Sequence, residues 1–143
     1  MSLSQLSIFL ENKPGRLLEV TKVLSDAQID IRAVSVADTK DFGILRLIVS
    51  DAKKAQQELE AANCLVSISE VICVTVSDEP GSLMKVIKML SDGCINIEYM
   101  YAFLTNTTKF AYIVFQVTDR QRATQILKDA GVTLVSEEDV LAL

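Results

Sequence analysis

Two loops of this 143-residue chain combine residue types that suit the binding of a small charged molecule. Residues 11–16 read ENKPGR, and residues 77–82 read SDEPGS. Glycine lets the backbone approach a ligand closely, and we expect each proline at the first position of a helix. The first amides of a helix lack internal partners and lie at the positive end of its dipole. Both loops are therefore predicted to suit an anion such as a carboxylate.

Two pairs of polar side chains accompany these loops. Asn12 and Asp78 each lie two residues before the proline. Their oxygens can accept hydrogen bonds from an ammonium group or cap the following helix, and both interpretations stay open. Asp30 and Asn96 each lie between two isoleucines where a strand is expected to begin. Either they follow the ordinary alternation of a strand, or they supply the second half of a ligand site against the loop of a neighbouring unit.

The side-chain inventory excludes several kinds of catalytic chemistry. The chain has no histidine, so neither a Ser-His-Asp nor a Cys-His site can form, and a zinc site cannot use imidazole. Cys64, Cys73 and Cys94 are widely spaced, and we interpret them as free thiols. We interpret the acidic run at residues 137–139 as a solvated end. We therefore predict no enzymatic activity, no cofactor and no metal.

Charge and hydropathy limit which binding partners and which cellular compartment are expected. Fourteen basic and nineteen acidic residues give a formal net charge of −5, and the basic residues are scattered. Nucleic-acid binding depends on a basic face that displaces counterions, so it is not expected. No apolar run reaches the roughly 18 residues of a membrane span, so no membrane association is expected. Residues 1–5 lack the basic start of a signal peptide, and the predicted compartment is the cytoplasm.

The chain is an internal duplication. Residues 8–31 read IFLENKPGRLLEVTKVLSDAQIDI, and residues 74–97 read VTVSDEPGSLMKVIKMLSDGCINI. The offset of 66 residues becomes 68 further along, which predicts a two-residue insertion between residues 105 and 109 in the second copy. Two domains are expected from this pattern, over residues 1–70 and 71–143.

Hydropathy periods predict the order β-α-β-β-α-β in each copy. Alternating apolar residues indicate a first strand, an amphipathic helix follows Pro-Gly, and two further strands precede a second helix. The last strand is expected over residues 65–69 in the first copy and 133–139 in the second. This order is typical of an α+β ferredoxin-like fold. We expect two units, each a four-stranded antiparallel sheet with two helices on one face.

The second strand of the second copy is apolar on both faces. We expect Ile95, Ile97, Tyr99, Tyr101 and Phe103 on one face and Met100, Ala102 and Leu104 on the other. Apolar character on both faces indicates cover on both sides. Packing against the partner repeat and an intermolecular interface both account for this pattern, and a homodimer of the chain would provide the interface.

The ordered set of these motifs, present twice, resembles the ACT domains, which are small amino-acid-sensing modules. The resemblance covers nearly the whole chain as two consecutive repeats. It includes an alternating strand, Asn-x-Pro-Gly or Asp-x-Pro-Gly, an amphipathic helix, and Ile-Asp-Ile or Ile-Asn-Ile. It implies the ferredoxin-like fold, side-by-side pairing of domains, and binding of an amino acid at the junction between paired domains.

The resemblance also implies ligand-binding residues. Asn12 matches the amide before Pro-Gly that contacts the effector in serine-sensing members, and Asn96 matches the asparagine of the second motif. Leu10 departs from that pattern, which often has histidine there. We expect the ligand carboxylate at the helix amides, with Arg16 as a helper, and the ammonium at the polar side chains. The implied set is Asn12, Gly15, Arg16, Leu17, Asp30, Ile31, Asp78, Gly81, Ser82, Leu83, Asn96 and Ile97.

Two functional hypotheses follow. In the first, the chain is a non-enzymatic regulatory sensor that binds a small amino acid between paired ACT-like domains and changes how the protein meets a partner. In the second, it is a regulatory subunit that docks on a metabolic enzyme without binding an amino acid itself. An enzyme on the same fold is disfavoured, because no loop carries the glycine-rich anion site of an acylphosphatase.

Overall fold

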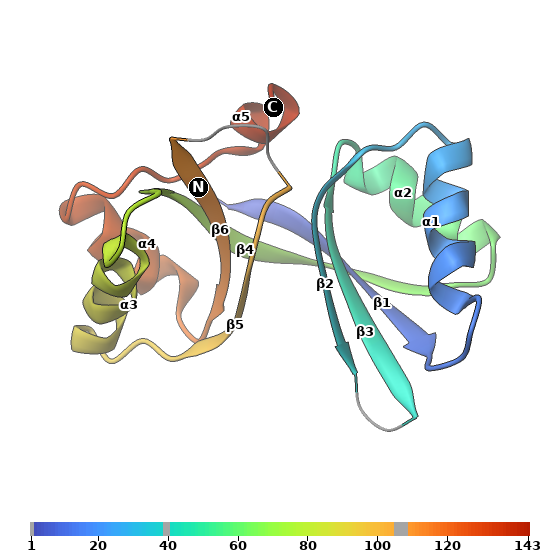
Figure 1. The fold of residues 1–143 in the computed structure, drawn as a ribbon, viewed down its shortest axis with the longest axis horizontal. Helices are drawn as coiled ribbons and strands as arrows, with labels where there is room; N and C mark the ends of the chain where they lie inside the picture. The colour runs from blue at the N-terminus through green and yellow to red at the C-terminus, as the bar shows by residue number, and fades with distance from the viewer. Residues whose placement is uncertain (1, 39–40, 105–108) are drawn as a thin grey trace. The chain divides into compact units, whose positions relative to one another are not determined.

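A computed structural model describes residues 2–38, 41–104 and 109–143. The predicted insertion lies outside the described residues apart from Lys109. The predicted α+β class is confirmed, and none of the described helices is long and apolar enough to cross a lipid bilayer (Figure 1). The elements are β1 (Leu3–Glu11), α1 (Arg16–Asp26), β2 (Ile31–Asp38), β3 (Phe42–Val49), α2 (Ala52–Ala61), β4 (Leu65–Ser77), α3 (Ser82–Asp92), β5 (Ile97–Ala102), β6 (Phe110–Val117), α4 (Arg120–Asp129) and α5 (Glu137–Leu141).

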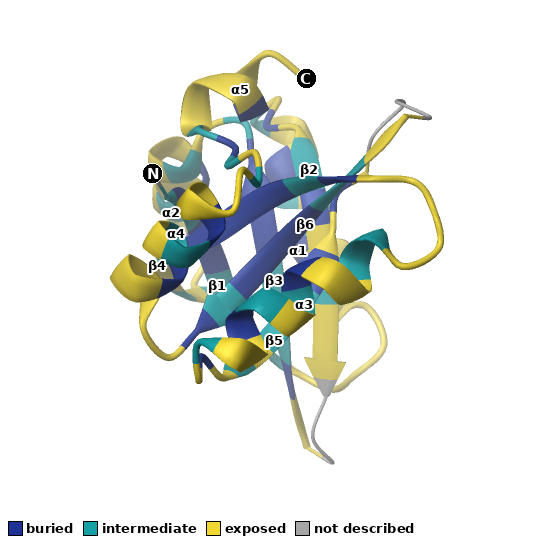
Figure 2. Ribbon diagram, turned by 90° about the vertical axis from the view of Figure 1, so that its left-hand side faces the viewer, coloured by how far each residue is buried: buried dark blue, intermediate teal, exposed yellow. Residues whose placement is uncertain are grey.

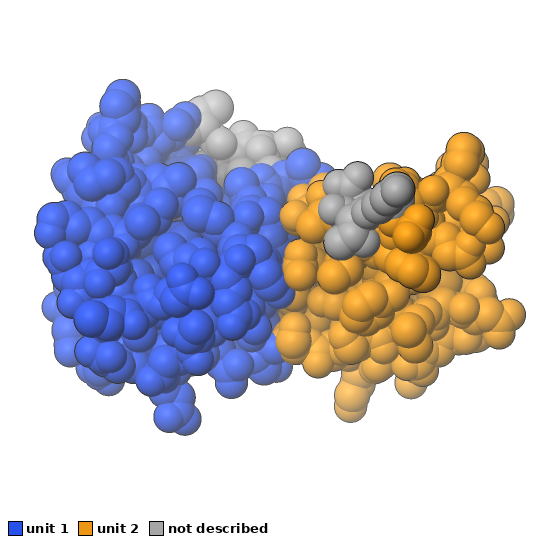
Figure 3. Space-filling model, turned by 90° about the horizontal axis from the view of Figure 1, so that it is seen from below, with its two compact units in different colours: residues 1–3, 70–143 blue, residues 4–69 orange. Residues whose placement is uncertain are grey.

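Residues 4–69 form one compact unit, drawn in orange in Figure 3. Its strand order begins β2-β3-β1, and β4 follows β1. The strands β1 and β2 both pair antiparallel with β3, so that Leu47 lies opposite Leu6 on one side and Val34 on the other. The helices α1 and α2 cover one face of these strands (Figure 1).

One apolar cluster holds this unit together. It combines alternate residues of the strands with one face of each helix, because each element turns only one face to the core. In Figure 2 the strand interiors are dark blue, whereas the outer sides of the helices are yellow. The buried members are Leu6, Ile8, Val20, Leu24, Ile29, Leu45, Leu47, Val49, Ala55 and Leu59.

Residues 70–143 form the second compact unit together with residues 1–3, drawn in blue in Figure 3. The strand β4 belongs to both units, because the boundary between Ser69 and Glu70 falls inside it. The second unit has the strand order β4-β6-β5, with antiparallel pairing. Its core repeats that of the first copy. The buried members are Ile72, Val74, Val76, Val86, Leu90, Ile95, Ile113, Phe115, Val117, Ala123 and Leu127.

The last predicted strand, over residues 133–139, is wrong for most of its length. Only Leu134 forms a bridge, to Val74 of β4, and the chain then turns into α5. Ser136 accepts a hydrogen bond from the N–H of Asp139, whose carboxylate accepts one from the N–H of Ser136. This capping box, with Val135 buried in front of it, starts a helix where alternation suggested a strand.

The predicted faces of the second strand in the second copy are also wrong. The register of β5 on β6 shifts between Ile97 and Tyr99, and β2 shifts at the equivalent place on β3. One extra residue in a strand sends every later side chain to the opposite face. Met100 therefore packs on the core opposite Phe115, as Ile97 does beside Val117. Tyr99 and the residues that alternate with it lie on the other face.

The capping box makes α5 sensitive to one substitution. Ser136→Ala removes the acceptor for the N–H of Asp139, which costs about 1 kcal/mol at a helix N-cap. Amide hydrogen exchange within residues 139–142 should accelerate roughly five-fold, since this energy corresponds to such a factor. Ser67→Ala, at an exposed position of β4, is the matched control. Equal protection in both variants would contradict the role of the cap.

The same capping box predicts that the stability of α5 depends on pH. Hydrogen bonding to Ser136, first of all to its backbone N–H, lowers the pKa of the Asp139 carboxyl. A carboxyl whose pKa is lowered by folding stabilises the fold above its unfolded pKa, and the contribution disappears as the pH falls through the folded pKa. Chemical shifts of α5 should therefore move toward coil values in acid, below the ordinary carboxyl pKa of 3.8. Asp139→Asn should show the uncapped shifts already at neutral pH.

Candidate functional site

Each Pro-Gly loop ends in a left-handed glycine. Gly15 has φ 89° and ψ −15°, and Gly81 has φ 90° and ψ −11°. These glycines are the N-caps of α1 and α3, so the prolines lie in the turn before them, and the prediction of proline at the first helical position is wrong. Glycine adopts this conformation without strain, and the loops consequently share one backbone path from strand to helix.

Among the described residues, no side chain caps the N-terminus of α1 or α3. The interpretation of Asn12 and Asp78 as helix caps is therefore wrong. Their backbone N–H groups donate to the carbonyls of Asp41 and Lys109, at 3.1 and 3.2 Å, which ties each loop to the neighbouring hairpin. Both side chains are exposed. The alternative interpretation, in which they accept hydrogen bonds from an ammonium group, stays a prediction.

The start of the second strand is fixed in the same way in both copies. The N–H of Asp30 donates to Ser50 Oγ at 3.0 Å, and the carbonyl of Asp30 accepts from the N–H of Ser50 at 3.0 Å. Asn96 makes the same two contacts with Thr118, at 3.3 and 3.1 Å. The side chains of Asp30 and Asn96 are exposed, and the Asp30 carboxylate pairs with Arg32 at 2.9 Å.

An open cavity of about 390 Å³ lies beside the start of β2. It brings together two predicted site residues, Asp30 and Ile31, whereas the predicted residues of the first loop do not line it. Helix α1 contributes Thr21, Leu24 and Ser25 to its wall. This hollow has a carboxylate and hydroxyl groups at its rim and an apolar floor.

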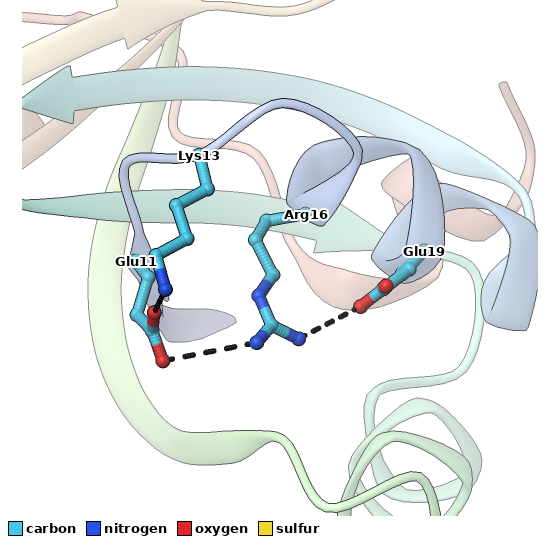
Figure 4. A network of polar contacts seen from close by, with 4 residues as sticks. All are labelled: Glu11, Lys13, Arg16 and Glu19. Atoms are coloured by element: carbon cyan, nitrogen blue, oxygen red, sulfur yellow. Dashed lines mark hydrogen bonds and ion pairs between the residues drawn. The ribbon is translucent and has the colours of Figure 1, made fainter.

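Four charged side chains form a network over the loop of the first copy (Figure 4). Lys13 donates to Glu11 at 2.8 Å, and Arg16 pairs with Glu11 at 3.8 Å and with Glu19 at 3.1 Å. The hydrogen bond from Lys13, with the charges of Lys13 and Arg16, lowers the pKa of the Glu11 carboxyl. Arg16, the predicted helper for a ligand carboxylate, is thus engaged by two carboxylates of its own copy.

The second copy has a different loop chemistry at the equivalent positions. Ser77 and Ser82 replace Glu11 and Arg16, and their hydroxyl oxygens lie 2.6 Å apart. Ser77, Ser82 and Lys85 line an open cavity of about 280 Å³ between α3, β4 and residues 131–133. Only Ser82 belongs to the predicted set. Aligning the two copies would have singled out Ser77 and Lys85, because the first copy has a glutamate at each of these positions.

The remaining predicted residues have mixed surroundings. Leu83 and Ile97 pack against the core cluster of the second copy, and Ile31 packs against that of the first. Leu17 is exposed at the start of α1. Ile31, Leu83 and Ile97 therefore help to pack the cores of the two copies.

Of the three free thiols, Cys94 is exposed, whereas the other two are at least partly buried. Cys73 is buried, and burial raises its pKa to about 12, so the thiol stays protonated at neutral pH. Burial also raises the pKa of the half-buried Cys64. Within the described ranges, no group of three or more His, Cys, Asp or Glu side chains is arranged to hold a metal ion.

The duplicated ferredoxin-like fold, with a glycine-capped helix behind the first strand of each copy, defines the class of this protein, and comparison with known proteins gives its family. The family model of the ACT domain pair matches residues 1–143. The chain belongs to the ACT domain pair family, as its motifs predicted. The comparison with curated proteins finds no match.

Solved structures agree with this family. Protein BT0572 from Bacteroides thetaiotaomicron is 41% identical, with a TM-score of 0.93, and the match covers 100% of this chain and 98% of that chain. The ligand-free regulatory subunit of aspartate kinase from Thermus thermophilus is 14% identical, with a TM-score of 0.63, over 89% of this chain and 91% of that chain. Aspartate kinase from Synechocystis is 20% identical, with a TM-score of 0.60, over 93% of this chain but 26% of that chain. The last two likenesses concern the fold.

The left-handed glycines make a stability prediction with an internal control. A Cβ added at Gly15 or Gly81 would meet nothing within 4 Å, so the cost of Gly→Ala there is purely conformational. We expect each substitution to lower the free energy of unfolding by about 1–2 kcal/mol in urea titrations. Gly43→Ala has ordinary space and no positive φ, and should be close to neutral. A similar loss in all three variants would contradict the conformational explanation.

Proposed function

We propose that the protein is a non-enzymatic regulatory protein that binds a small amino acid at a junction between paired ACT units. The observation that carries the proposal is the uncapped start of α1 and α3, each behind a left-handed glycine and an exposed polar side chain. Uncapped helix amides favour a carboxylate. The N–H groups of Arg16 and Ser82 already donate to the carbonyls of Lys13 and Glu79, so it is the amides after them that support the proposed anion site in each copy.

The proposed binding mode divides the ligand between backbone and side chains. The carboxylate lies at the amides near Gly15 or Gly81, and the ammonium group donates hydrogen bonds to the oxygens of the polar residues. These residues are Asn12 with Asp30 in the first copy and Asp78 with Asn96 in the second. Regulation then requires that the ligand binds one arrangement of the protein more tightly than another, because only differential affinity shifts an equilibrium.

The proposed partners are a second copy of the chain and a metabolic enzyme. The likeness in fold to a regulatory subunit of aspartate kinase supports a regulatory partner of this kind. The three free cysteines suit a reducing compartment, which supports the cytoplasm as the place of action. An alternative function is a subunit that docks on an enzyme without binding an amino acid, and the ion-paired loop of the first copy favours it for that copy.

A thermal-shift screen of the whole chain against the twenty amino acids tests the proposal. A ligand that binds the folded state raises the stability by mass action, by about 2.7 kcal/mol at a concentration of 100 times Kd. We expect one chemical class of amino acid to raise Tm, with calorimetry giving the stoichiometry. Light scattering with and without the ligand should show a homodimer.

Paired variants locate the binding. The Asn12→Ala/Asp78→Ala and Asp30→Ala/Asn96→Ala variants should lose the shift but keep their own unfolding transitions, because all four side chains are exposed. Absence of any shift at millimolar concentrations would overturn the sensor. Capture of a metabolic enzyme by a chain that binds no amino acid would establish the docking alternative.

A further inference from the structure

Two strands cross the boundary between the two compact units. The strand β4 runs unbroken through the boundary between Ser69 and Glu70. The strand β1 begins at Leu3, which belongs to the second unit, and continues from Ser4 in the first unit. These two strands are neighbours in the sheet. Each unit therefore contains part of two strands that the other unit also uses.

Side-chain contacts fix both strands on either side of this boundary. In the first unit, Gln5 is fully buried, and its Nε2 donates to Ser69 Oγ at 3.4 Å. In the second unit, the hydroxyl of Ser2 donates to the carboxylate of Glu70. The carbonyl of Glu70 accepts from Arg120 Nη1 at 3.4 Å, which ties β4 to the start of α4. Both strands are thus anchored in each unit close to the boundary.

The residues next to the boundary are those of a packed sheet. Leu3 is only 1% exposed, and Val71 is fully buried. Ser4, Ser69 and Glu70 are half-buried. Domains that move or unfold separately are usually joined by exposed segments rich in glycine, proline and polar residues. The residues around this boundary, all of them described, do not form such a segment.

The two cores by themselves favour the opposite behaviour. Among the described residues, the core clusters of the two copies have no buried member in common. Separate clusters allow separate unfolding, as in the cooperative subunits of larger proteins. The placement of Ser2 and Leu3 decides between the two possibilities. When the first copy unfolds and β1 leaves the sheet, the second unit loses the burial of Leu3 and the hydrogen bond from Ser2 to Glu70.

From this continuity we infer that β1 and β4 couple the two copies into one cooperative unit, so that a change in the stability of one copy is transmitted to the other. This coupling goes beyond the proposed function, because it needs no ligand. It has a direct consequence for a regulatory protein. A molecule that binds one copy stabilises the folded state by mass action, and the coupling extends this stabilisation to the copy that the molecule does not contact.

Matched core substitutions test the coupling by native-state hydrogen exchange of the whole chain. Val20 and Val86 are buried at equivalent positions of α1 and α3. Val20→Ala removes buried apolar volume and should accelerate exchange of the most protected amides about tenfold or more. We expect the same factor in β3 of the first copy and in β6 of the second, and the same result for Val86→Ala. Acceleration confined to the substituted copy would overturn the coupling.

A substitution at the start of β1 gives a second readout. Leu3→Ala should accelerate exchange about thirtyfold or more, as large-to-small changes of buried leucine do. Leu3 belongs to the second unit, but we expect β3 of the first copy to respond as strongly as β6. Ser67→Ala, at an exposed position of β4, is the control and should change neither strand. An unchanged β3 in Leu3→Ala would contradict coupling through β1.

An insertion separates strand continuity from core packing. Two glycines placed between Ser69 and Glu70 keep the alternation of faces on both sides, because the side-chain period of a strand is two, and they add a flexible break. In a chain that combines this insertion with Leu3→Ala, Val20→Ala should accelerate exchange in β3 more than in β6. Equal acceleration in both strands would show that β1 and β4 do not carry the coupling. A thermal transition confirms that this chain folds, and the two preceding tests do not depend on it.

Failure of the coupling and failure of the proposed function are distinguishable. If no amino acid binds but exchange in the two copies changes together, the proposed function fails and the coupling stands. If an amino acid binds but each core substitution affects one copy only, the proposed function stands and the coupling is overturned.

Discussion

Burial of one apolar sheet face beneath two helices is the interaction on which each copy depends. Truncating a fully buried leucine such as Leu24 or Leu90 to alanine removes about 2–5 kcal/mol. The total stability of a domain is only about 5–15 kcal/mol. Such positions therefore tolerate little change, and several of them, such as Leu24 and Leu90 or Leu59 and Leu127, carry the same residue in both copies. The exposed loops before the helices contribute much less to stability, so their charged residues can differ between the copies.

Where the packing itself differs between copies, the changes are paired. In the second copy a Cβ on Gly93 would lie 2.4 Å from Ile126 Cδ1, so the isoleucine occupies the space that glycine leaves. The first copy has Ala27 and Glu58 at these positions, and both line an open hollow between α1 and α2. A larger residue on one helix accompanies a smaller one on its neighbour, because close-packed elements transmit any change in volume.

The periodicity of the sequence predicted most of the fold, and its failures have local causes. A bulge adds one residue without changing composition, so the alternation through Ile97 and Tyr99 concealed the reversal of faces. The end of the chain was mistaken for a strand, although Ser136 and Asp139 have the spacing of a capping box. The glycine turn was predictable from its sequence. The cavity at Lys85 was not, because it depends on what neighbouring side chains leave open.

Magnitudes indicate what the charged network of the first loop does. Its members are between 44% and 67% exposed, and exposed ion pairs contribute about 0–1 kcal/mol each. The network is therefore a minor part of the stability beside the core. The network matters more for the charge that the loop offers to a ligand, because the only arginine of the loop already pairs with two carboxylates. A duplicated unit can thus keep two similar cores for folding while the charged residues of its loops differ between the copies.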